Sequence, residues 1–132
     1  MAARNHERNI MTTTLLIALA GLMGAAGIML AAAGAHAAPG AGLDGAAYML
    51  LFHAAALLGG VALLQQGALW RPLALIALAA WVVGAVLFSG DIALRAFAGH
   101  RLFAFAAPSG GVILILAWLA LTVAAIVSAM SR

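Results

Sequence analysis

The sequence predicts an all-α, polytopic membrane protein, a compact bundle of four transmembrane helices joined by short loops. Composition carries most of this prediction: 67% of the 132 residues are hydrophobic and 7% are charged. About a quarter of the residues of a soluble domain are charged, so this chain cannot cover a surface that faces water. A span needs about 20 apolar residues. The chain therefore has room for four spans in a single membrane domain covering residues 1–132.

Composition also excludes several kinds of partner and chemistry. The net charge of +3 comes from six basic residues against three acids. The arginines stand apart, near the ends of the apolar runs, so we expect no nucleic-acid binding. The chain has no cysteine, which excludes disulfides and cysteine-ligated metal centres. No catalytic triad, phosphate loop or pair of carboxylates is present, and we expect a protein that is not an enzyme.

The first span is predicted at residues 13–35, after a polar segment. Thr12, Thr13 and Thr14 are typical N-terminal caps. Gly21 and Ala25 have the spacing of small residues that lets helices approach closely in lipid. We therefore expect this helix at the centre of the bundle.

A secretory signal is the alternative interpretation of this segment. Arg4 and Arg8 precede the apolar run, and Ala35-His36-Ala37 resembles a cleavage site. The run is longer than the 7–15 residues usual in a signal, so we expect an uncleaved span. Met1 and Met11 are both possible starts of the chain.

The second span, residues 46–65, contains one ionisable side chain, His53. An imidazole inside an apolar helix is costly unless another group satisfies it. The third span is predicted at residues 73–94, after Trp70 as an interfacial anchor, Arg71 as a flanking charge and Pro72 as a helix start.

The third span ends among polar residues. Asp91 and Arg95 are four residues apart, so they can pair if the helix continues through both. An interfacial loop is predicted at residues 97–108. Pro108, Gly110 and Gly111 then form a turn motif that breaks the chain before the fourth span, residues 111–129.

Orientation follows from the arginines. Four of them, Arg4, Arg8, Arg71 and Arg132, fall on the side of both termini, and Arg95 and Arg101 fall on the other side. Because positive charge is enriched on the cytoplasmic side, we expect both termini in the cytoplasm.

With this topology, the polar residues of the spans gather in the outer half of the bilayer. His53 is expected about 10 Å below the start of its helix. The predicted polar cluster consists of His36, Tyr48, His53, Ser89, Asp91 and Arg95.

Three interpretations of this cluster remain open. The first is a buried hydrogen-bond network of His53, Tyr48, Ser89 and Asp91 that fixes the helix register. The second is a proton-relay pair of His53 and Asp91. The third is a haem or metal held by His36 and His53. Two histidines without a third ligand are a weak metal signal, so we predict no metal or cofactor and keep haem as the alternative.

Several motifs resemble one family of membrane proteins. The order and spacing are those of the YgdD-like family of small four-helix inner-membrane proteins (uncharacterised protein family 0382, domain of unknown function 423), over residues 15–128. The motifs are Ala31-Ala32-Ala33-Gly34-Ala35-His36, Phe52-His53-Ala54, Leu87-Phe88-Ser89-Gly90, Pro108-Ser109-Gly110-Gly111 and Ala117-Trp118. The family usually has serine where this chain has Asp91. The resemblance implies an uncleaved four-helix protein of the bacterial cytoplasmic (inner) membrane and implies no activity.

Function remains divided between three hypotheses. We expect a protein that acts through helix association, as a homo-oligomer or as an accessory subunit of a membrane complex in the lipid bilayer. The first alternative is an oligomeric channel or transporter for protons or small solutes that uses the polar cluster. The second alternative is a haem- or quinone-associated redox subunit.

Overall fold

The computed structural model describes the backbone of residues 2–131, and the side chains of residue 4 and residues 6–131. This range holds four helices and no strand: α1 (Ala2–His36), α2 (Leu43–Gln65), α3 (Arg71–Ala98) and α4 (Ala106–Met130). All four are long and apolar enough to cross a membrane, which confirms the predicted fold class. Met1, a possible start of the chain, and Arg132, one of the arginines counted for the orientation, lie outside the described residues.

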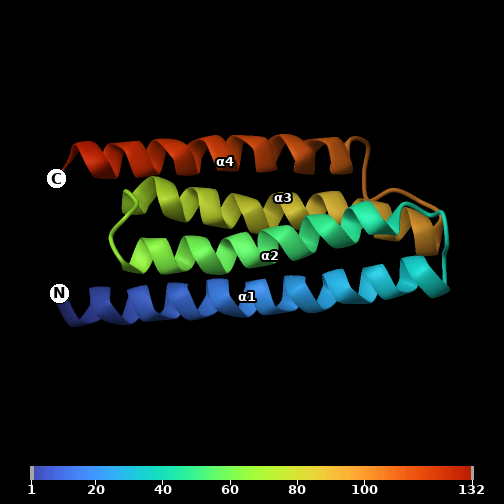
Figure 1. Cartoon of the computed structure of the whole chain (residues 1–132), viewed down its shortest axis with the longest axis horizontal. Helices are drawn as coiled ribbons and strands as arrows, with labels where there is room; N and C mark the ends of the chain where they lie inside the picture. Colours follow the sequence, from blue (N-terminus) through green and yellow to red (C-terminus); the bar gives the residue numbers. More distant parts are fainter. Residues whose placement is uncertain (1, 132) are drawn as a thin grey trace.

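The helices lie beside one another in chain order and alternate in direction (Figure 1). α1 packs on α2 and also touches α3, α2 packs on α3, and α3 packs on α4. Both described ends of the chain and the α2–α3 turn lie together, at what we call the termini end. The α1–α2 and α3–α4 loops lie at the opposite end, called the loop end (Figure 1).

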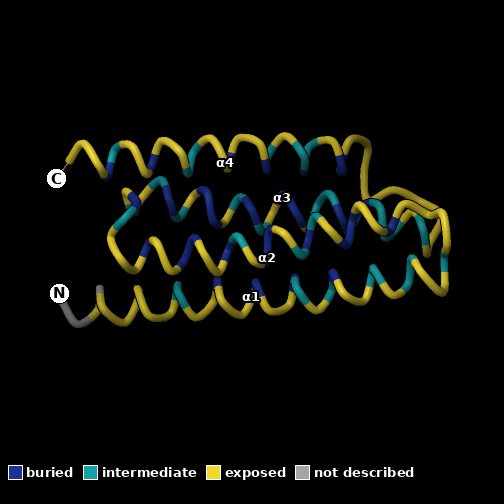
Figure 2. The backbone as a smooth tube through the Cα atoms, viewed as in Figure 1, coloured by how far each residue is buried: buried dark blue, intermediate teal, exposed yellow. Residues whose placement is uncertain are grey.

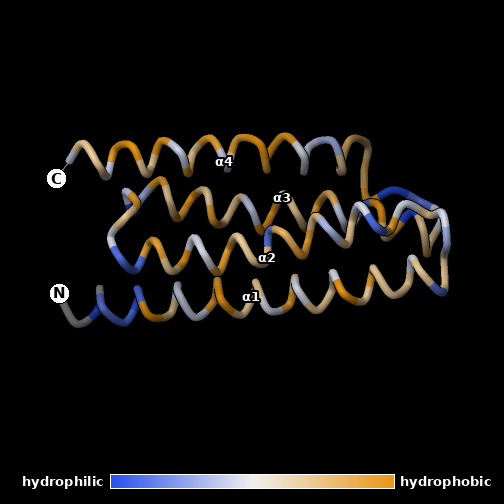
Figure 3. The backbone as a smooth tube through the Cα atoms, viewed as in Figure 1, coloured by the Kyte–Doolittle hydropathy of each residue, from blue (hydrophilic) through white to orange (hydrophobic). Residues whose placement is uncertain are grey.

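Helices α2 and α3 form the centre of the bundle. Of the residues in the most apolar stretch of each helix, 44% are buried in α2 and 39% in α3, whereas 22% are buried in α1 and in α4 (Figure 2). The prediction that the first helix is central was therefore wrong. Small residues occur on more than one side of α1, and their spacing does not say which side is packed. Figure 3 shows the apolar length of the helices and the polar residues near both ends, as expected in a bilayer.

Helix α1 begins well before the predicted span. The segment expected to precede it is helical from Ala2, so the threonines expected to cap it lie inside the helix. The hydroxyls of Thr12 and Thr13 donate to the carbonyls of Arg8 and Asn9, at 2.8 and 2.9 Å. A hydroxyl inside a helix can bond the carbonyl four residues back, which is what these two do.

The turn between α2 and α3 is closed by a glycine and held by α4. Gly67 has φ of 70°, and the Ala68 N–H donates to the Leu63 carbonyl at 3.0 Å. This is the glycine-terminated end common to helices. The Trp70 N–H donates to the Ala124 carbonyl at 2.9 Å, which attaches the turn to α4.

The start of α4 also departs from the prediction. The α3–α4 loop covers residues 99–105, and the predicted turn motif lies inside the first turns of α4. Pro108 is tolerated there because the N–H groups of a first helical turn have no intrahelical acceptor. A Cβ added at Gly110 would lie 2.6 Å from the Gly84 carbonyl oxygen. This glycine therefore marks a close approach of α4 to α3, not a break in the chain.

Candidate functional site

His53 lies near the middle of α2, and its side chain is 7% exposed. It is ten residues from the start of α2 at Leu43, which places it about 15 Å along the helix. This is deeper than the about 10 Å expected from the sequence, because α2 begins three residues before the predicted span. His53 is thus close to the midplane of the helices and not in their outer half.

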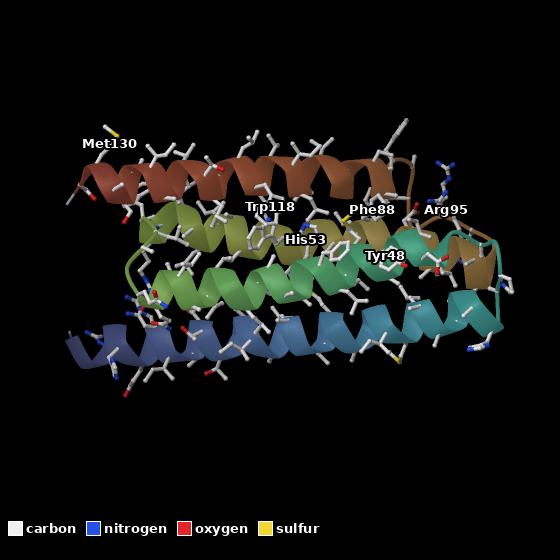
Figure 4. The ribbon with its side chains drawn as sticks, viewed as in Figure 1. Tyr48, His53, Phe88, Arg95, Trp118 and Met130 are labelled. Carbon is white, nitrogen blue, oxygen red and sulfur yellow. The ribbon has the colours of Figure 1, made fainter. Side chains whose placement is uncertain are left out.

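Both ring nitrogens of His53 have partners inside the protein. Nδ1 lies 2.8 Å from the carbonyl oxygen of Met49, and the indole Nε1–H of Trp118 donates to Nε2 at 3.2 Å. A carbonyl only accepts and an indole N–H only donates. The ring that fits these partners is therefore neutral, with its hydrogen on Nδ1. Figure 4 shows His53 and Trp118 beside one another, far from Arg95 at the loop end.

A second tryptophan completes a group that we call the His53–tryptophan cluster: His53 of α2, Trp81 of α3 and Trp118 of α4. The ring centroid of His53 lies 6.2 Å from that of each tryptophan, and the two indoles are 4.4 Å apart. Both contacts of His53 have the edge-on geometry that aromatic pairs favour, and the two indoles are tilted against one another. The cluster thus connects three helices at one depth.

One polar group of the cluster is unsatisfied. Trp81 is 1% exposed, and its indole Nε1 has no hydrogen-bond partner among the described residues. Such a buried donor costs about 1–3 kcal/mol. The indole packs against Gly60 of α2, where a Cβ would lie 3.3 Å from the ring. Trp81 is therefore held by packing, and Trp118 makes the polar contact.

Asp91 organises the loop end of α3. Its side chain is 2% exposed, and Oδ2 lies 3.0 Å from Arg95 Nη2. The other oxygen, Oδ1, accepts the backbone N–H of Leu102 at 2.9 Å. The helix is continuous through both residues of the pair, which is the condition the sequence set for their pairing. Asp91 thus fastens the α3–α4 loop to α3.

The six residues of the predicted polar cluster do not meet at one place. Ser89 donates to the Ala46 carbonyl of α2 at 2.8 Å. Tyr48 is 56% exposed and stacks on Phe52, and His36 is exposed at the end of α1. The described hydrogen bonds and ion pairs join Asp91 to Arg95 but none of the other four to one another. The single network and the His53–Asp91 pair were wrong, because His53, Ser89 and Asp91 each bond other groups.

The histidines are also separated from one another. His36 ends α1 at the loop end, whereas His53 lies about 15 Å along α2 from that end. His53 Nε2, the nitrogen that would face a ligand, already accepts from Trp118. Within residues 2–131 no group of three His, Asp or Glu side chains is placed to hold a metal ion.

Sequence reasoning missed Trp81 and Trp118 as partners of His53 and assigned them to packing or an interfacial belt. The number of residues between each of these side chains and the end of its helix gives part of the answer. Measured from the termini end of each helix, His53, Trp81 and Trp118 lie twelve, ten and twelve residues deep. This count places the three side chains at nearly the same depth, but it does not say which sides of the helices face one another.

Comparison with known proteins identifies the family. The family model described as "Protein of unknown function (DUF423)" matches residues 23–111. The chain belongs to the DUF423 family. The match agrees with the resemblance seen in the motifs, and it includes His53 and Asp91. Trp118 lies beyond the matched residues. Searches of the curated proteins and of the solved structures found no match to this DUF423 chain.

Proposed function

We propose that this multi-pass membrane protein has no catalytic role and acts through helix association, in the first place with a second copy of itself. The observation that carries the proposal is an unused face of small residues on α1. Apart from its chain neighbours and the backbone of its own helix, no described atom lies within 4 Å of a Cβ placed at Gly21. The faces of Ala18, Ala25 and Ala32 are likewise exposed.

Lipid chains are as apolar as the helices, so hydrophobicity does not drive helix association in a bilayer. Close packing does, and small residues allow it. α1 has already used one such face within the chain: a Cβ at Gly27 would lie 3.1 Å from the Ala47 carbonyl oxygen of α2. The face of Gly21 and Ala25 offers the same kind of surface to a helix from outside.

The His53–tryptophan cluster supports a structural role for the polar residues of the spans. His53 uses one ring nitrogen within α2 and the other toward α4. A proton path or an axial ligand through Nε2 would require the bond to Trp118 to break. The bond from Trp118 to Nε2 therefore disfavours the channel and redox alternatives. The cluster instead keeps α2, α3 and α4 in register.

We further propose that the protein lies in the bacterial cytoplasmic membrane with its termini in the cytoplasm. Arg4, Arg8 and Arg71 lie at the termini end. At the loop end, Arg95 is paired within α3 and Arg101 is exposed. The excess of positive charge at the termini end supports this orientation. The test is to replace Ser131 or His100 by cysteine and to label intact cells with a reagent that does not cross the membrane. The cysteine at residue 100 should react, and the one at residue 131 should not.

The association test is the mass of the protein in lipid nanodiscs, measured for three chains. The unmodified chain is expected to be a dimer or a larger homo-oligomer. Gly21→Leu is expected to shift it toward the monomer, because the side chain separates the helices. Gly59→Leu is the matched control, since Gly59 of α2 is also exposed with no atom within 4 Å of a Cβ.

A monomeric unmodified chain would refute association between copies. Equal effects of Gly21→Leu and Gly59→Leu would refute the assignment to α1. A monomer that co-purifies with another membrane polypeptide, and loses it in Gly21→Leu, would identify an accessory subunit that uses the same face.

A further inference from the structure

A groove lies on the side of the bundle where α1 and α3 approach one another. These two helices run in the same direction (Figure 1) and touch only lightly. They enclose a groove of about 460 Å³, with Leu50 of α2 among its lining residues. At the half nearer the termini end, its walls include Leu19, Leu22 and Met23 of α1 and Val82 of α3. We call it the α1/α3 groove.

A polar pocket lies on the same seam at the termini end. It has a volume of about 420 Å³ and is lined by Arg8, Asn9, Thr12, Arg71 and Leu75. We call it the arginine pocket.

The pocket and the groove follow one line along the bundle. Thr12 is seven residues from Leu19, and Leu75 is seven residues from Val82. Seven residues are about two helical turns, which returns a side chain to the same face about 10 Å further along the helix. The pocket and the groove therefore lie on the same faces of α1 and α3, in line with one another.

The arginine pocket is positively charged. Arg71 Nη2 donates to Asn9 Oδ1 at 2.7 Å, which holds the guanidinium beside α1. Arg71 is also the first residue of α3, where the positive end of the helix dipole lies. The chain has three acidic residues, and two of them lie at the loop end. The third, Glu7, is not among the residues that line the pocket.

We propose that the α1/α3 seam binds an anionic phospholipid. Its phosphate would lie in the arginine pocket, where guanidinium N–H groups match phosphate oxygens in pairs. One acyl chain would lie in the near half of the α1/α3 groove. A chain spans about half of the 30 Å hydrocarbon layer, about 15 Å. Measured from Thr12, that length ends near Leu22 and Met23, which line the groove.

This inference is independent of the proposed association. Gly21 and Ala25 do not line the groove, and the two substitutions that test lipid binding, at Arg71 and Val82, are both in α3. We therefore expect Arg71→Gln and Val82→Phe to lower lipid retention and to leave the oligomeric state unchanged.

The test is native mass spectrometry of the full chain after reconstitution. The bilayer contains equal amounts of phosphatidylglycerol and phosphatidylethanolamine with identical acyl chains. Phosphatidylglycerol should be retained preferentially. Arg71→Gln should lower its retention about fivefold, the ratio that corresponds to about 1 kcal/mol per arginine near anionic lipid.

Three further variants separate charge, structure and chain binding. Arg101→Gln removes an exposed arginine at the loop end and should leave retention unchanged. Asn9→Ala removes the bond that holds Arg71 but keeps the charge, and it should lower retention less than Arg71→Gln does. Val82→Phe fills the near half of the groove and should lower retention without changing the charge.

Several results would overturn the proposal. Equal retention of the two lipids would exclude selection by charge. Equal losses in Arg71→Gln and Arg101→Gln would exclude the arginine pocket. Unchanged retention in Val82→Phe would exclude the groove. Displacement of the lipid by millimolar inorganic phosphate would show a site for the free anion.

Discussion

Replacement of Gly110 by alanine tests the packing of α3 against α4. The new Cβ would lie 2.6 Å from the Gly84 carbonyl oxygen and 2.7 Å from the Phe88 nitrogen. Both are backbone atoms, so no side chain can turn aside, and α4 must move away from α3. Forcing an extra methyl into a packed interior typically costs 1–3 kcal/mol. We expect about 2 kcal/mol, a roughly thirtyfold change in the unfolding equilibrium.

The adjacent glycine provides the control. A Cβ at Gly111 meets no atom within 4 Å, and alanine is favoured over glycine in a helix by up to about 1 kcal/mol. Gly111→Ala should therefore be neutral or slightly stabilising. The assay is reversible unfolding in mixed micelles with increasing sodium dodecyl sulfate, followed by tryptophan fluorescence. If both variants unfold at the midpoint of the unmodified chain, the close approach of α3 and α4 is wrong.

Three more predictions concern the polar contacts. Trp118→Phe leaves His53 Nε2 without its donor and should lower the free energy of unfolding by about 0.6–1.7 kcal/mol in the same assay. Trp70→Phe, at the exposed termini end, should lower it less. Equal losses in the two variants would contradict the assigned contact. Nitrogen NMR of labelled histidine in bilayers should find the hydrogen of His53 on Nδ1, and a hydrogen on Nε2 would exclude the bond from Trp118. Asp91→Leu removes the acceptor of the Leu102 N–H and should raise the hydrogen-exchange rate of that amide about fivefold, for a lost bond of about 1 kcal/mol. Asp91→Asn keeps an acceptor and should raise the rate less. Similar rates in both variants would refute the anchoring role.

The four helices were predictable because a local property determines them. A long apolar run must form a helix in lipid, where every backbone group needs a partner inside its own segment. Each predicted span therefore lies inside one of the four helices. Helix ends were harder, because polar residues such as those before Thr12 can form a helix or a coil according to what surrounds them.

The motif around Gly110 illustrates a different limit. Proline and glycine together are typical of a turn, and that was the prediction. The structure uses the proline in a first helical turn and the glycine at a contact with Gly84. A glycine that allows a turn and a glycine that allows close packing look the same in a sequence, because both lack a Cβ.

The sequence by itself determined that this protein spans a membrane four times, that it belongs to the DUF423 family, and that His53 needs partners in an apolar helix. Only the tertiary structure decided which partners these are. Trp118 is 65 residues away, and residue counts give its depth but not its direction. Helix rotation and neighbour choice depend on packing against other helices. For the same reason, the seam between α1 and α3 and the free face of Gly21 became visible only in the folded chain.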